Sequence, residues 1–137
     1  MNQPAPSLPA LQHKAADCLD AYCQAQGITH PCIDELLEHL RSMARYPNLA
    51  LWEQAGAGLA LNGRGDDMPA TLRAMLTPEL AERFHTLVCN VVEVGLADMY
   101  GQGSVLPRTF LARVVEMLEQ EPIERPSDLG SAAPAPT

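Results

Sequence analysis

The sequence predicts an all-α protein, a single-domain bundle of about five to six helices. Ala and Leu are strong helix formers and occur 19 times each, against 16 β-branched residues. Apolar residues recur at i, i+3 and i+4 along several segments, which is the helical period. The prolines fall between these segments or at their starts, where helices tolerate them.

The first half of the chain contains three expected helices, over residues 9–26, 31–46 and 49–61. Gly27 stands where a C′ glycine ends the first helix, and Pro31 suits the first position of the second. Asn48 is a favourable N-cap for the third helix. Gly56 and Gly58 lie inside that helix, and they predict either a close approach of another element or an earlier helix end.

The second half contains a loop over 62–68 and three further helices, over residues 69–76, 78–100 and 106–121. Thr77-Pro78-Glu79 combines an N-cap residue, a first-position proline and an acidic first turn. The segment 78–100 is apolar on nearly every side, so we expect it at the centre of the bundle.

The chain ends have a different composition from the helical domain, which we place at residues 9–121. Residues 1–8 contain two prolines, Pro4 and Pro6, and are expected to be flexible. Residues 122–137 are rich in Pro and Ala and cannot bury enough apolar surface to fold, so we expect a disordered tail.

The charge balance excludes several classes of partner. Nine Lys and Arg stand against 17 Asp and Glu, a net charge of −8. This balance argues against nucleic acid and against anionic lipid, both of which need clustered cations. No apolar run approaches the roughly 18 residues of a membrane span, and no signal peptide precedes the first helix. We therefore expect a cytoplasmic protein with four reduced cysteines.

No catalytic set and no cofactor motif is found, so we expect a protein that is not an enzyme and binds no cofactor. The cysteines and histidines lack the paired spacing of a structural zinc site, and we assign no metal ligands. A metal-binding helical protein that uses His30, Cys32 and the carboxylates at 66–67 remains a weaker alternative. His39 lies between Glu38 and Arg41 and is expected to face water. Trp52 is expected to anchor the core, with an interface role as the alternative.

Acidic residues in three places are candidate contacts for a basic protein partner. Three of them lie on the outer face of the second expected helix, one lies in the third expected helix, and two lie in the glycine-rich loop. The candidates are Asp34, Glu35, Glu38, Glu53, Asp66 and Asp67. For the loop pair, the alternative to partner binding is a structural role, in which the loop forms a turn and Asp66 or Asp67 caps the following helix.

The order of several short motifs resembles a group of small, acidic, all-α bacterial proteins similar to the immunity proteins of polymorphic or secretion-system-delivered toxins. The resemblance covers about residues 15–120, and its motifs are Trp52-Glu53, Leu59, Gly63-Arg64-Gly65-Asp66-Asp67-Met68-Pro69, Val91-Val92-Glu93-Val94-Gly95 and Met99-Tyr100-Gly101. It implies a protein that binds and neutralises a cognate toxin without catalysis. A secretion chaperone or adaptor that binds an effector segment is the alternative. The sequence leaves the oligomeric state open.

Overall fold

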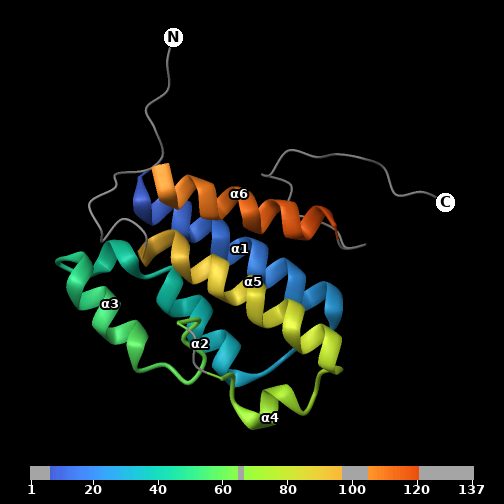
Figure 1. Ribbon diagram of the computed structural model, residues 1–137. Helices are drawn as coiled ribbons and strands as arrows, with labels where there is room; N and C mark the ends of the chain where they lie inside the picture. Colours follow the sequence, from blue (N-terminus) through green and yellow to red (C-terminus); the bar gives the residue numbers. More distant parts are fainter. Residues whose placement is uncertain (1–6, 65–66, 97–104, 121–137) are drawn as a thin grey trace.

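All regular elements in the described part of the chain are helices, which confirms the predicted all-α fold (Figure 1). The computed structural model describes residues 7–64, 67–96 and 105–120. Its elements are α1 (Leu8–Gln26), α2 (Pro31–Leu40), a 3-10 turn (Met43–Arg45), α3 (Leu49–Ala57), α4 (Ala70–Arg73), α5 (Pro78–Leu96) and α6 (Val105–Glu119). The predictions for the tail at 122–137 and for Asp66 lie outside the described residues. None of these helices combines the length and the apolarity that a membrane crossing requires.

Helix α5 lies at the centre of the bundle, as its apolar circumference predicts. It packs along both α1 and α6, and α1 and α6 also pack against each other (Figure 1). Helix α2 covers another side of α1, with α3 and α4 farther out. The residues of α5 that are buried are Ala81, Phe84, Leu87, Val88, Val91, Val92, Val94, Gly95 and Leu96.

A polar side chain and a glycine hold α1 close to α5. The Gln12 side chain is fully buried, and its Nε2 donates to the Val91 carbonyl oxygen over 2.8 Å. A Cβ atom at Gly95 would lie 2.3 Å from Gln12 Oε1 and 2.7 Å from Trp52 Cη2. The glycine therefore provides the space in which the glutamine and the tryptophan meet α5.

Most helix starts fall where the capping residues predict them. Asn48 Oδ1 accepts from the Leu51 N–H over 3.0 Å, and Thr77 Oγ1 accepts from the Leu80 N–H over 3.2 Å. Gly27 ends α1 in the left-handed conformation, at φ 70°. The loop residue Gly63 also has a positive φ, and a Cβ there would lie 2.5 Å from Val92 Cγ2, so it lies close against α5.

Helix α2 ends six residues before the predicted end at residue 46, because the His39 carbonyl is taken by other donors. The Ser42 N–H, the Ser42 hydroxyl and the Trp52 indole N–H donate to this oxygen over 3.0, 2.7 and 2.9 Å. The next α-helical bond, from the N–H of Met43, is replaced by a 3-10 turn.

Helix α3 also ends early, at Ala57 instead of 61, and both interpretations of its glycines hold. Gly58 is the C-cap residue, while Gly56 is buried against His39 and Arg64. Helix α4 is shorter than the predicted 69–76, and its N-cap residue is Pro69, not Asp67. The alternative cap from Asp66 lies outside the described residues.

Candidate partner-binding site

The exposed face of α2 carries three of the six predicted contact residues. This helix buries Ile33, Leu36, Leu37 and Leu40 against the bundle, and the helical period leaves Asp34, Glu35 and Glu38 exposed to solvent. We call these three residues the α2 ridge. Within the described residues, no Lys, Arg or His lies within ion-pair distance of the ridge carboxylates.

The start of α2 is fixed by a histidine cap. His30 Nδ1 accepts from the Cys32 N–H over 3.1 Å, and its Nε2 lies 2.8 Å from Thr71 Oγ1 in α4. Pro31 occupies the first helical turn, and Asp34 lies near the positive end of the helix dipole. The ridge therefore sits on a helix that is anchored to a distant part of the chain.

Other carboxylates near α2 are already paired. Arg41 Nη2 lies 2.8 Å from Asp17 Oδ1 and 3.3 Å from Asp20 Oδ2, which ties the end of α2 to α1. Burial of the guanidinium opposes its charge, but the hydrogen bonds to the two aspartates outweigh burial and raise the pKa of Arg41. The ridge carboxylates lack such a partner, so their charge remains available to a binding protein.

Two hollows flank the ridge. The first, of about 500 Å³, lies between α2 and α3, and we call it the α2–α3 hollow. It is lined by Glu35, Glu38, His39, Ser42, Arg45, Tyr46, Ala55 and Leu59. The second, of about 410 Å³, lies between α1 and α2 and is lined by Asp20, Asp34, Leu37, Glu38, Arg41 and Arg45. Glu38 and Arg45 line both, so the two hollows form one uneven surface around α2.

His39 does not face water, which corrects the prediction drawn from its charged neighbours. It is only 9% exposed and stacks on Trp52, with ring centroids 4.7 Å apart and planes 7° from parallel. Tyr46 meets the imidazole edge-on at 6.2 Å. The signal was present in the sequence, because His39 lies three residues after Leu36 and four before Met43, on the apolar stripe.

The surroundings of His39 disfavour protonation of its imidazole. Burial, followed by the nearby charge of Arg64, lowers the pKa of His39. Its Nε2 is buried and has no hydrogen-bond partner in the described part of the chain. Trp52 is fully buried, which confirms its predicted role as a core anchor.

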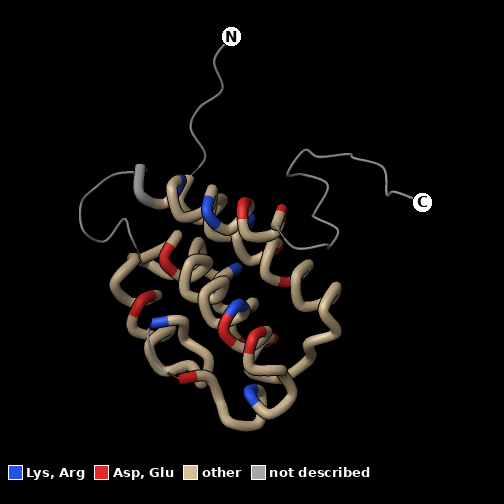
Figure 2. The backbone as a smooth tube through the Cα atoms, turned by 45° about the vertical axis from the view of Figure 1, so that its right-hand side comes forward, with Lys and Arg blue, Asp and Glu red and all other residues tan. Residues whose placement is uncertain are grey.

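The remaining predicted contacts do not join the ridge. Glu53 is half-buried and forms an ion pair with Arg64, so its charge is neutralised inside the fold. Asp67 is exposed in the loop after α3, and Asp66 lies outside the described residues. Acidic positions are spread over several helices rather than gathered in one block (Figure 2).

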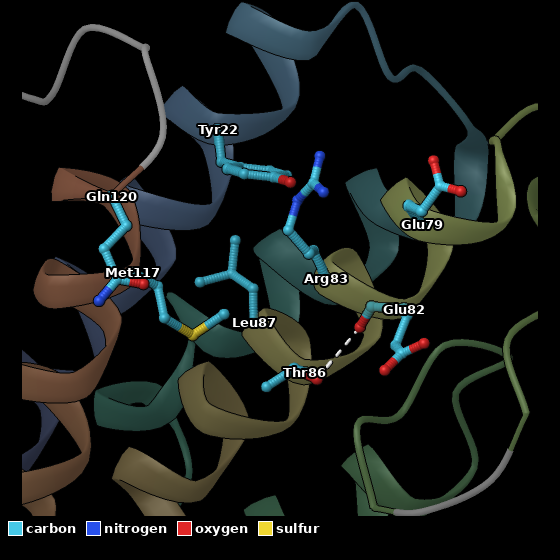
Figure 3. A pocket seen from close by; sticks show the side chains of 8 residues that line it. All are labelled: Tyr22, Glu79, Glu82, Arg83, Thr86, Leu87, Met117 and Gln120. Carbon is cyan, nitrogen blue, oxygen red and sulfur yellow. Dashed lines mark hydrogen bonds between the residues drawn. The ribbon is translucent and has the colours of Figure 1, made fainter.

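A further hollow, of about 370 Å³, lies where α1, α5 and α6 meet, and we call it the end hollow. Tyr22 of α1, Leu87 of α5 and Met117 of α6 converge on it and give it an apolar floor (Figure 3). Arg83, Glu79, Glu82 and other polar residues form its rim, and no sequence pattern pointed to it.

The cysteines and histidines form no metal site in the part that the structure describes. No three His, Cys, Asp or Glu side chains there are grouped closely enough to hold a metal ion. Cys18, Cys23 and Cys32 are buried thiols, and burial, followed by the charge of Asp20, raises the pKa of Cys23 to about 12. His30 is used as a helix cap.

Comparison with known proteins gives no match: no protein-family model fits the chain, and no curated protein or solved structure is significantly similar to it.

Proposed function

We propose that this protein neutralises a cognate toxin by binding it without catalysis, with the α2 ridge against a basic surface of the toxin. The observation that carries the proposal is the presence of three exposed carboxylates on one short helix, free of ion pairs among the described residues. The net charge of −8 supports it, because opposite charge steers association and excludes wrong partners. The motif resemblance to immunity proteins points in the same direction.

The ridge is suited to a rigid binding surface. Its helix is capped by His30, tied to α1 through Arg41 and packed on the core through Leu36 and Leu40. A partner that binds there meets charges already held in place, so little ordering entropy is lost on association.

The test is co-expression with the products of the adjacent genes. We expect one neighbour to be toxic alone, to be tolerated with this protein, and to co-purify with it. The variant Asp34→Asn/Glu35→Gln/Glu38→Gln should weaken this complex about 10- to 100-fold, at 1.4 kcal/mol per factor of ten. The control variant Glu79→Gln/Glu82→Gln/Glu116→Gln removes the same charge from exposed positions on α5 and α6 and should bind normally. If neither neighbour is inhibited or captured, the proposal is wrong.

A second candidate function is supported by the end hollow. Its apolar floor and polar rim suit a peptide-like segment of an effector, which is how an adaptor or secretion chaperone binds. An adaptor of this kind would lose binding with Leu87→Ala or Met117→Ala and would tolerate the ridge variant. The toxin-neutralising protein should show the opposite pattern.

A further inference from the structure

The α2–α3 hollow has the size and the charge to receive one side chain of a partner. Its volume of about 500 Å³ lies within the range of roughly 300–1,000 Å³ for ligand pockets. Glu35 and Glu38 line it from α2, three residues apart and therefore on the same helix face. Arg45 is the one Lys or Arg in this lining, so the two carboxylates leave it with an acidic excess.

The floor of this hollow is aromatic. His39, nine-tenths buried and with an unpartnered Nε2 in the described structure, stacks on Trp52, and Tyr46 stands edge-on to it. Leu59, which follows the end of α3, adds an apolar wall. An aromatic and apolar floor beneath two carboxylates favours a planar cation with a hydrocarbon stem.

We propose that the α2–α3 hollow receives an arginine side chain of the basic partner, with the guanidinium paired to Glu35 and Glu38 and the stem against Tyr46 and Leu59. This inference rests on the proposed function, since it names the group by which the toxin is recognised. Arginine fits better than lysine, because its planar fork pairs with two carboxylate oxygens at once and stacks on aromatic rings. A lysine ammonium would keep more of its hydration.

The first experiment uses a short peptide as the probe, independent of any toxin. The peptide acetyl-Gly-Arg-Gly-amide is compared with the same peptide in which neutral citrulline replaces arginine. The indole N–H of Trp52 is the NMR reporter, because the chain has one tryptophan and its ring stacks on His39. We expect a saturable shift with the arginine peptide at low salt and about tenfold weaker binding of the citrulline peptide, the loss of one charge-assisted contact.

Two pairs of variants locate the binding. Glu35→Gln/Glu38→Gln should weaken binding of the arginine peptide about tenfold. The control Glu116→Gln/Glu119→Gln changes two exposed residues of α6 that line none of the three hollows, and it should leave the affinity unchanged. Ala55 lines the hollow and Ala57 does not, and both are exposed on α3. Ala55→Met should fill the hollow and abolish the shift, and the matched change Ala57→Met should leave it unaltered. Circular dichroism checks that each variant is folded.

The outcomes separate this inference from the proposed function. Equal binding of both peptides, or normal arginine binding by Ala55→Met, overturns the arginine inference. A toxin complex that is weakened by the ridge variant but not by Ala55→Met also overturns it and leaves the proposed function standing. If neither the ridge variant nor Ala55→Met weakens the toxin complex, both the arginine inference and the proposed function are wrong.

Discussion

At the scale of single residues, His39 combines a polar side chain with an apolar position. Its ring stacks on Trp52, and burial, followed by the nearby charge of Arg64, lowers its pKa. The cost is an unpaired Nε2 in the described structure. An apolar side chain would pack here without this cost. Because His39 can bind a proton, its burial makes the stability of the folded state depend on pH.

We predict that the protein loses stability as the solution is acidified, in part through His39. The pKa of His39 is lowered in the folded state, so the unfolded chain binds the proton more tightly. Its contribution is complete above the unfolded pKa of about 6.5 and is lost as the pH falls toward and through the folded pKa. Urea unfolding of His39→Phe should show a smaller loss between neutral and mildly acidic pH than the native protein. Equal slopes for the native protein and His39→Phe would contradict the argument.

Gly95 is the residue that sets how closely α1 and α3 approach α5. An added methyl group would lie 2.3 Å from Gln12 Oε1, 2.7 Å from Trp52 Cη2 and 2.9 Å from Met43 Cε. The glutamine and methionine ends can move, but the tryptophan ring is fixed by its packing and by its bond to the His39 carbonyl.

Gly95→Ala should therefore lower the free energy of unfolding by about 2 kcal/mol, the usual scale of overpacking. The same substitution at Gly58 is the control, because its nearest contact would be the Ala55 oxygen at 3.8 Å. Gly58→Ala should be neutral or stabilise by up to about 1 kcal/mol. Chemical denaturation measures both, and similar values for the two variants would show that the contacts at Gly95 relax freely.

At the scale of helices, the starts were predictable and several ends were not. Pro31, Asn48 and Thr77 carry local signals, because a cap bonds to N–H groups two or three residues away. The end of α2 depends on the indole of Trp52, 13 residues farther along the chain. A local pattern cannot contain such a bond, so the sequence alone placed this end six residues too late.

Arg41 shows how one side chain joins two helices, and its removal should loosen them. Its ion pairs with Asp17 and Asp20 are partly exposed, with 30% of the Arg41 side chain accessible, so water screens part of their energy. Arg41→Ala should cost about 1 kcal/mol in unfolding experiments. Arg45→Ala removes an exposed arginine that forms no ion pair in the described structure and should change stability by less than about 0.5 kcal/mol. A larger cost at Arg45 than at Arg41 would refute this account of α1–α2 docking.

At the scale of the whole molecule, the candidate site could be predicted only as a charge pattern. The period of α2 placed Asp34, Glu35 and Glu38 outward from the sequence alone. The hollows beside them arise where α2 meets α1 and α3, and the pairing of Glu53 with Arg64 arises across a loop. These features depend on tertiary packing. The sequence pattern alone therefore included Glu53 among the free carboxylates and did not indicate the aromatic floor of the α2–α3 hollow.

The same charge distribution leads to a prediction for the kinetics of the proposed toxin complex. A net charge of −8 acts over a distance, whereas the ridge contacts act only after docking. Raising the salt from about 0.01 M to about 0.1 M shortens the Debye length from about 30 Å to about 10 Å. The association rate constant should therefore fall about tenfold, while the dissociation rate constant changes much less.

The ridge variant Asp34→Asn/Glu35→Gln/Glu38→Gln should associate slowly at low salt and respond weakly to added salt, because its steering charge next to the docking surface is gone. It should also dissociate faster, since its direct contacts are lost. The variant Glu79→Gln/Glu82→Gln/Glu116→Gln has the same net charge, so it separates the position of the charge from its amount. Surface plasmon resonance across this salt range measures both rate constants. If the two variants behave alike, only the total charge matters and the ridge is not the docking surface.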